Sequence, residues 1–174
     1  MGKKKWQILE TIINIYMDRQ GYNIINSESK FDDIDIEGQK TYLHGLGSRH
    51  EIDAMGVYSH RVPFVYPIRL ISEVKCYSDD RAIGPHIVRE MVGLMEDVNK
   101  KNRSGENLSE QNSHRYMNAG AIFSTSNFKL TSQQLAYSHG IFLINVNPIK
   151  KHVERLHIAS EHLNYEDFSE VVRS

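Results

Sequence analysis

The sequence predicts an α/β fold with a central mixed β-sheet and helices on both faces, from three patterns of hydrophobic residues. Two apolar segments within 45–77 have the composition of strands, and a turn-like stretch at 59–63 separates them, which predicts a β-hairpin. Residues 6–20 and 85–98 repeat apolar side chains at helical spacing. A strand at 117–124 and another at 141–146 are joined by a short helical segment, which predicts a parallel pair.

The first predicted helix, 6–20, carries apolar residues on one face and ends at Gly21. Glu10 lies within this apolar sector and is interpreted, from the residues alone, as a carboxylate solvated at the helix edge. Residues 22–26 have the composition of a short strand. The acidic stretch 27–39 is predicted to be a solvated loop, in preference to a metal-binding cluster.

The second and third helices are predicted from residues that are typical of helix starts and ends. Pro85 opens the second helix, where its missing N–H costs nothing. Residues 99–115 are polar and are predicted to form a mobile loop. Thr131 and Gln134 fit a capping box at the start of the third helix, which Gly140 ends. Residues 1–147 are therefore predicted to be one domain, and 148–174 a C-terminal helical extension.

The amino-acid composition limits the kinds of function that this chain can have. The chain has 174 residues, of which 40% are hydrophobic and 25% charged, enough for one globular domain with a core. A net charge of −1 counts against a strong non-specific DNA binder. It does not exclude a protein that contacts DNA through a local positive face. The one cysteine, Cys76, excludes an intramolecular disulfide and favours a cytoplasmic location. No apolar run is long enough to span a membrane, and the histidines show no zinc-ligand spacing with Cys76.

Three charged residues stand in the otherwise apolar strands of the predicted hairpin: Asp53, Glu73 and Lys75. Glu73 and Lys75 share one face, because side chains alternate along a strand. Without Asp53, Glu73 and Lys75 fit an exposed ion pair, and Asp53 by itself fits a turn at a strand end. The hairpin brings all three together, however, and burying them is costly unless a divalent metal binds the carboxylates.

Six segments, in order along the chain, carry a resemblance to a known family. They are LETII at 9–13, GSRHEID at 47–53, ISEVKCY at 71–77, IVREMVGLMEDV at 87–98, AIFSTSNF at 121–128 and SHGIFLI at 138–144. These segments resemble the PD-(D/E)xK nuclease superfamily, and within it the Mrr-like restriction endonuclease catalytic domain. Ile52 stands where the superfamily's name has Pro, and no separate DNA-reading domain is present. The resemblance implies a restriction-endonuclease-like fold and makes 1–147 an Mrr-like nuclease domain.

The resemblance also implies a mechanism. Asp53 and Glu73 would hold Mg²⁺, for which Mn²⁺ could substitute, together with the main-chain carbonyl of Val74. Lys75 would orient the attacking water during phosphodiester hydrolysis of DNA. Glu10, on the first helix, would support the metal site. The implied setting is restriction of foreign DNA, an antiviral defence.

Other residues are predicted to contact DNA or to support the site. Arg49 and His50 precede the Asp53 strand and are either surface residues at the strand entrance or part of the site. In the second case Arg49 can meet a phosphate bidentately and His50 can support the site. Arg89 lies off the apolar face of its helix and is either an ordinary surface residue or a DNA contact. Ser124 and Thr125 end a strand, where their hydroxyls either satisfy backbone groups, the preferred interpretation, or bind phosphate.

Two other functions remain open from the sequence. One is a structure-selective nuclease of the junction-resolvase type, and the other is a module with a nuclease fold that binds DNA or a protein without cutting. A homodimer or larger assembly is expected, because one Asp/Glu/Lys set cuts one strand and a C₂ pair supplies two sets. The tail from Pro148 is the predicted contact between the two copies.

Overall fold

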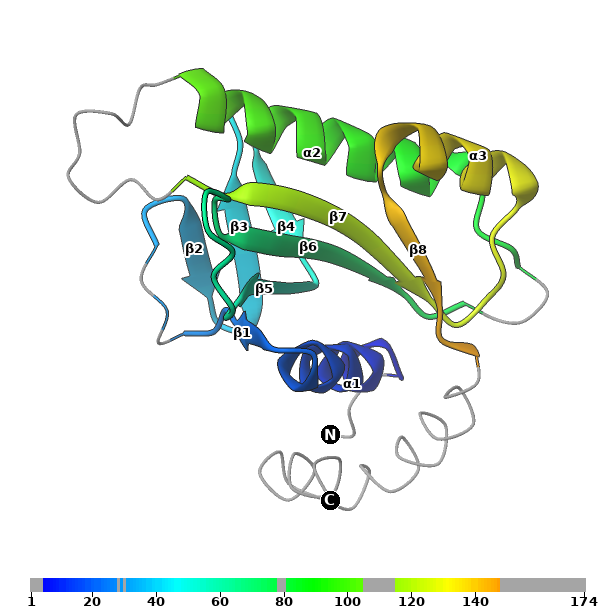
Figure 1. Ribbon diagram of the computed structural model, residues 1–174. Helices are drawn as coiled ribbons and strands as arrows, with labels where there is room; N and C mark the ends of the chain where they lie inside the picture. The colour runs from blue at the N-terminus through cyan, green and yellow to red at the C-terminus, as the bar shows by residue number, and fades with distance from the viewer. Residues whose placement is uncertain (1–4, 28, 30, 78–80, 105–114, 148–174) are drawn as a thin grey trace, which may run out of the picture.

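The computed structural model describes residues 5–27, 29, 31–77, 81–104 and 115–147. Within these ranges the chain forms three helices and eight strands (Figure 1). The helices are α1 (Lys5–Arg19), α2 (Pro85–Ser104) and α3 (Leu130–His139). The strands are β1 (Tyr22–Ile24), β2 (Ile34–Glu37), β3 (Lys40–His44), β4 (Arg49–Ile52), β5 (Ala54–Tyr58), β6 (Ile68–Lys75), β7 (Met117–Ser124) and β8 (Phe142–Asn145).

The larger sheet has five strands in the order β1-β5-β6-β7-β8. Strands β5 and β6 form the predicted antiparallel hairpin, in which Ala54 lies opposite Ser72. Strands β7 and β8 continue the sheet in parallel with β6. The parallel pairing of β7 with β8 is the one that the short helical crossover predicted. Helix α1 covers one face, and α2 with α3 covers the other (Figure 1). The predicted α/β class, a central mixed sheet with helices on both faces, is confirmed.

Each face of the sheet has its own apolar core, because successive side chains of a strand point to opposite faces. On β6, Ile71 belongs to the core under α2, whereas Val74 belongs to the core under α1. Helix α1 contributes residues at helical spacing, with Leu9, Ile13 and Met17 almost fully buried. Burying each such side chain contributes about 1.5–3 kcal/mol, which fixes α1 against the hairpin.

A second sheet, in the order β2-β3-β4, corrects the prediction for the acidic stretch 27–39. Residues 34–37 are strand β2, which pairs antiparallel with β3, and not a solvated loop. Ile34 and Ile36 pack against the core while Asp35 and Glu37 face solvent, the period-2 alternation of a half-buried strand. The acidic composition concealed this alternation in the sequence.

A buried arginine, which no pattern in the sequence predicts, joins the two sheets. Arg69 on β6 is fully buried, and its Nη1 lies 2.7 Å from Asp33 Oδ2, just before β2. Its Nε donates to Asn118 Oδ1 at 2.8 Å, and its guanidinium lies over the Tyr116 ring. A buried charge needs such partners, so removing Asp33 would leave Arg69 uncompensated.

Three further predictions have outcomes. Helix α2 continues to Ser104, so 99–104 is not a loop, and 105–114 lies outside the described residues. The predicted capping box is wrong, because Lys129 is the N-cap and makes no side-chain cap bond. Gly140 ends α3 as predicted, with a φ of 66° that favours glycine. The predicted extension 148–174 also lies outside the described residues.

Where the chain is described, no helix is both long and apolar enough to cross a membrane.

Candidate active site

Asp53 lies at the junction of the two sheets. Strand β4 of the smaller sheet ends at Ile52, and β5 of the larger sheet begins at Ala54, so Asp53 is the bend between them. The sequence predicted a strand through this residue, with a turn at a strand end as the alternative, and the structure shows a bend at the strand end. Asp53 Oδ2 accepts a hydrogen bond from the Val74 N–H at 2.7 Å, which holds the carboxylate against β6.

Glu73 and Lys75 lie at the end of β6 beside this bend. Their side chains form an ion pair between Lys75 Nζ and Glu73 Oε1, on the face shared by alternate residues. Continuing the hairpin register one step beyond Ala54 and Ser72 places Asp53 opposite Glu73. The structure therefore brings together the three charged residues that the sequence singled out.

Two carboxyl groups at this position, those of Asp53 and Glu10, have pKa values above the usual range. Burial raises the pKa of Asp53 to about 6, with the charge of Glu73 adding to the effect, while the Val74 N–H and Lys75 oppose it. Glu10 reaches the same region from α1, and burial raises its pKa to about 8, with Asp53, Glu51 and Glu73 adding to the rise. Repelling carboxylates in a partly desolvated site are destabilising unless a cation joins them.

The backbone of Val74 faces the same edge as Asp53. The carbonyl of Lys75 accepts a hydrogen bond from the Thr125 N–H on the β7 side. Successive residues of a strand point their backbone groups to opposite edges, and the Val74 N–H already points to Asp53. The Val74 carbonyl is therefore directed towards the edge where the two carboxylates lie.

This donor set fits a divalent cation that keeps part of its water shell. Among the residues that the structure describes, no three His, Cys, Asp or Glu side chains form a ready metal site. Mg²⁺ does not require such a cage, because it binds through one or two carboxylates and retains several waters. Asp53, Glu73 and the Val74 carbonyl supply hard oxygen donors of this kind, and the raised pKa of Asp53 supports a site for positive charge.

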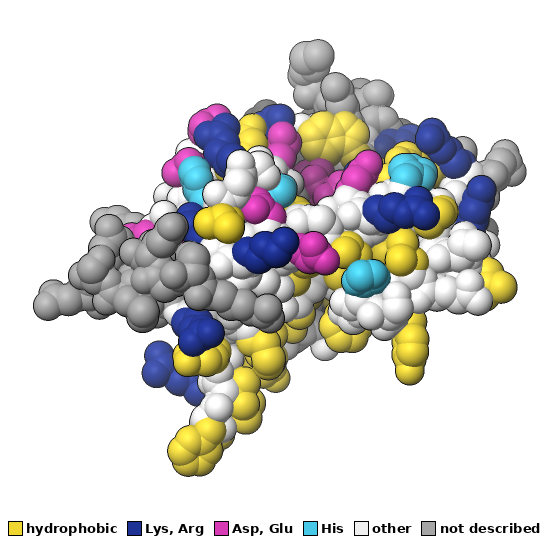
Figure 2. Space-filling model, turned by 90° about the horizontal axis from the view of Figure 1, so that it is seen from above, with side chains coloured by type: hydrophobic (Ala, Val, Ile, Leu, Met, Phe, Trp, Pro, Cys, Tyr) yellow, Lys and Arg dark blue, Asp and Glu magenta, His cyan; other side chains and the backbone are white. Residues whose placement is uncertain are grey.

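A pocket of about 270 Å³ opens beside Glu73, between β4 and α2. Figure 2, which views the molecule from the α2 side, shows Asp and Glu side chains gathered in a hollow with Lys, Arg and His side chains around it. Helix α2 supplies an aliphatic wall, and β4 supplies a polar one. The lining residues are Arg49, His50, Glu51, Glu73, Ile87, Glu90, Met91 and Leu94.

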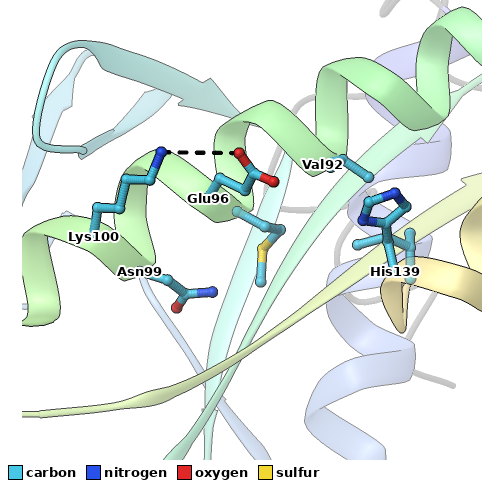
Figure 3. A pocket seen from close by; sticks show the side chains of 7 residues that line it. Val92, Glu96, Asn99, Lys100 and His139 are labelled. Atoms are coloured by element: carbon cyan, nitrogen blue, oxygen red, sulfur yellow. Dashed lines mark ion pairs between the residues drawn. The ribbon is translucent and has the colours of Figure 1, made fainter.

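A larger pocket, of about 390 Å³, lies between the second half of α2 and the end of α3 (Figure 3). Glu96 and Lys100 form an ion pair of 4.0 Å at its rim, and His139 faces them from α3. This pocket contains none of the charged residues at the end of the hairpin. The candidate site is therefore the smaller pocket, where Glu73 contributes to the lining.

His50 connects β4 to α2 through a carboxylate that the sequence did not single out. Its Nε2 lies 2.9 Å from Asp97 Oδ2, and the same carboxylate accepts the N–H groups of Gly47 and Ser48. These bonds, the one to His50 first, lower the pKa of Asp97 to about 2. A Cβ at Gly45 would lie 1.9 Å from Asp97 Oδ2, so this close approach requires glycine. The network holds the strand that leads to Asp53.

We expect Asp97→Asn to lower the free energy of unfolding by about 1–2 kcal/mol at pH 7, because the amide places donors against N–H donors. The depressed pKa of Asp97 adds stability above pH 4, which is lost as the pH falls towards 2. Urea unfolding between pH 7 and pH 3 measures the difference, which should shrink at the acidic end. Asp18→Asn, an exposed change on α1, is the control. Equal stability of wild type and Asp97→Asn at pH 7 would contradict this role.

The predicted DNA contacts have different surroundings. Arg49 is partly exposed, but its Nη1 lies 2.6 Å from Glu37 Oε1 and its guanidinium stacks on Tyr42. Arg89 is exposed on α2. Ser124 and Thr125 are fully buried, and Thr125 Oγ1 donates to the Tyr77 carbonyl. Their hydroxyls therefore satisfy internal groups, the alternative that the sequence favoured, and the assignment of both to DNA contact is corrected.

No protein-family model matches the chain, and none of the curated proteins does. Among solved structures, a protein of unknown function, AF1548, has a TM-score of 0.56 and 14% identity, covering 97% of this chain and 77% of that chain. This likeness shows the fold alone. MspJI restriction endonuclease, solved with a 27-mer oligonucleotide, has a TM-score of 0.42 and 12% identity, covering 95% of this chain and 31% of that chain.

The DNA modification-dependent restriction endonuclease AspBHI has a TM-score of 0.42 and 13% identity, covering 90% of this chain and 39% of that chain. At TM-scores below 0.5, the similarities to the two restriction endonucleases carry no functional argument. The case for a function therefore depends on the residues at the end of the hairpin.

Proposed function

We propose that this chain is a metal-dependent DNA endonuclease that hydrolyses phosphodiester bonds at the site of Asp53, Glu73 and Lys75. One observation carries the proposal: two carboxylates and an ammonium group converge where β5 begins and β6 ends, and burial together with the charge of Glu73 raises the pKa of Asp53 to about 6. The charge of Asp53 is unfavourable for folding at neutral pH, whereas it would stabilise a bound divalent cation.

The residues have separate roles in this proposal. Asp53, Glu73 and the Val74 carbonyl would hold Mg²⁺ or Mn²⁺. When bound, the ion would polarise the scissile phosphate and lower the pKa of a water. Lys75, held beside Glu73, would donate a hydrogen bond to the attacking water and stabilise the charge that develops on the phosphate. Glu10 would approach from α1 as a supporting carboxylate.

The biological setting is proposed from the resemblance of six segments to the Mrr-like restriction endonuclease domain. These segments fall within 9–144, and 1–147 would be the nuclease domain. In that setting the protein restricts foreign DNA. The structure adds the local geometry on which the chemistry depends, namely the Asp53 carboxylate bound to the Val74 N–H on β6.

Incubation with supercoiled plasmid, modified DNA and a four-way junction, each with and without Mg²⁺, tests the proposal. We expect nicking or linearisation that requires the metal and stops with a chelator. Paired cuts confined to the junction would identify a junction-resolving nuclease instead. Binding to all three DNAs without cleavage, in Mg²⁺ and in Mn²⁺, would contradict the proposal and indicate a non-cleaving module.

A homodimer is part of this proposal, because the described chain contributes one Asp/Glu/Lys set and a double-strand break needs two. Two copies related by a two-fold axis would supply both. Light scattering with and without DNA should give twice the mass of one chain in the active state. A monomer that makes double-strand breaks in a single binding event would contradict the dimer.

A further inference from the structure

The loop that connects β5 and β6 presents hydrophobic side chains to solvent. In residues 59–67, Phe64 is 108% exposed, and Val62, Val65 and Tyr66 are each at least 41% exposed. Figure 2 shows such a projection at its lower left, with hydrophobic side chains at the tip and Lys or Arg side chains beside it. Exposed apolar groups that gather in this way mark an interaction site more often than single exposed residues do.

Phe64 also has a backbone conformation that phenylalanine rarely adopts. Its φ is 65°, the one positive φ among the non-glycine residues that the structure describes. The Val65 N–H donates to the Val62 carbonyl at 3.2 Å, and Pro63 occupies the second position, as in a type II turn. Glycine is the usual residue at the third position. A bulky side chain held there at a conformational cost indicates that the ring is needed at the tip.

The loop and the residue that stacks on it carry basic side chains. Residues 59–67 include His60 and Arg61 and contain no acidic residue. Arg115 lies beside the loop, with its guanidinium carbon 5.1 Å from the centroid of the Tyr66 ring. The chain as a whole has a net charge of −1, so this local combination is not a consequence of its composition. Aromatic and basic side chains in a loop that contains no acidic residue fit a polyanion that also offers flat apolar groups.

We propose that loop 59–67 is a second DNA-binding element, in which Phe64 inserts between bases while Arg61 and Arg115 contact the flanking phosphates. The proposal rests on DNA being the ligand of this chain. Apolar side chains used as wedges partly unstack base steps and bend the duplex. Stacking of bases on aromatic rings tolerates any sequence, because every base has a π-face.

The loop lies far from the proposed catalytic residues, so its role in DNA binding is separate from phosphodiester hydrolysis. The tip and the Asp53–Glu73 pair lie at opposite ends of the β5–β6 hairpin, and β6 alone spans about 25 Å. Helices cover both faces of the sheet (Figure 1). In this proposal, DNA that contacts both ends of the hairpin would follow a bent path around the domain. Unstacking at Phe64 would make that bend less costly. The loop would therefore affect DNA affinity and bending, and not the rate of the chemical step.

Fluorescence anisotropy with a 40-bp duplex in the absence of divalent metal measures binding without cleavage. Phe64→Gly relieves the strained φ, so the variant should fold at least as well as wild type. We expect its affinity for DNA to fall about 5- to 100-fold, while Phe64→Trp retains affinity. Tyr137→Ala, which removes a 91% exposed aromatic from α3, is the matched control and should bind normally. Arg61→Ala should lower the salt dependence of binding by about one phosphate contact.

A second measurement separates this proposal from the proposed nuclease activity. Energy transfer between dyes at the duplex ends should report bending by wild type and its loss in Phe64→Gly. Unchanged affinity and bending in Phe64→Gly would overturn the loop's role and leave the nuclease proposal intact. Wild type that binds and bends DNA but never cuts it would contradict only the nuclease proposal.

Two outcomes would give the loop a different partner and overturn the proposal. In one, Phe64→Gly dissociates a dimer in light scattering without changing DNA affinity, which identifies a contact between copies. In the other, wild type sediments with vesicles of anionic lipid and Phe64→Gly does not, while both bind DNA equally.

Discussion

Asp53→Asn is expected to abolish DNA cleavage and at the same time to stabilise the metal-free protein. The amide oxygen of asparagine can still accept the Val74 N–H, so the bond that fixes the bend between β4 and β5 is retained. The negative charge, which burial and Glu73 disfavour, is removed. Cleavage should fall by about 10³-fold or more, because a carboxylate that would hold the metal is lost.

The gain in stability depends on pH. The folded pKa of Asp53, about 6, lies above its usual value of 3.8, so its stabilising effect is complete below pH 4 and is lost as the pH rises through 6. At pH 8 the carboxylate therefore destabilises the fold of wild type, and Asp53→Asn should be more stable by about 1–3 kcal/mol. At pH 4 the two proteins should be equally stable.

Thermal melts at pH 4 and pH 8, with and without Mg²⁺, measure both effects. At pH 8 the metal should raise the melting temperature of wild type and leave that of Asp53→Asn unchanged, because binding to the folded state alone is stabilising. Asp18→Asn, on the exposed side of α1, controls for loss of a carboxylate elsewhere. A variant that melts below wild type at pH 8 without metal, or that still cleaves DNA, would show that Asp53 has a structural role only.

The parts of the fold that the sequence predicted depend on short-range patterns. The helical faces of α1 and α2, the β5–β6 hairpin and the glycine at the end of α3 each follow from residues close together in the chain. Asp53, Glu73 and Lys75 could be grouped because one hairpin joins them. Their neighbourhood in the structure follows from the antiparallel register of β5 and β6.

The parts that the sequence did not predict depend on contacts between distant residues. Arg69 is buried because Asp33 and Asn118 reach it from other elements, and its own segment carries no sign of that. From the sequence, Asp97 fits a solvent residue of α2, yet its carboxylate accepts hydrogen bonds from the loop before β4. The approach is so close that a Cβ at Gly45 would lie 1.9 Å from Asp97 Oδ2. The sequence offers the bend at Asp53 only as the alternative to a position within a strand, because the second sheet that defines the bend includes β2, which the sequence predicts to be a loop.

Lys75→Met is expected to reduce cleavage by about 10²- to 10⁴-fold while the protein remains folded. Burial lowers the pKa of Lys75, but the hydrogen bond to Glu73 and the charges of Glu73 and Asp53 outweigh it, so the net shift is upward. Lys75 therefore stays protonated at physiological pH. It can donate hydrogen bonds and stabilise negative charge, but it is poorly suited to remove a proton from water.

A comparison of two substitutions distinguishes these roles. Arginine keeps a positive charge and its donors but cannot be deprotonated in a protein. If Lys75 acts as a cation, Lys75→Arg should retain at least ten times the activity of Lys75→Met, although the larger guanidinium will not reproduce its position beside Glu73. If Lys75 transfers a proton, both variants should be equally inactive.

Single-turnover cleavage rates, with thermal melts of each variant, measure the effect, and Lys129→Met on the exposed surface before α3 is the control. Full activity of a folded Lys75→Met would remove Lys75 from the mechanism. Equal inactivity of Lys75→Met and Lys75→Arg, with the Mg²⁺-dependent rise in melting temperature intact in both, would contradict the cationic role. The raised pKa predicts the opposite result, since an ammonium group that two carboxylates hold protonated acts through its charge.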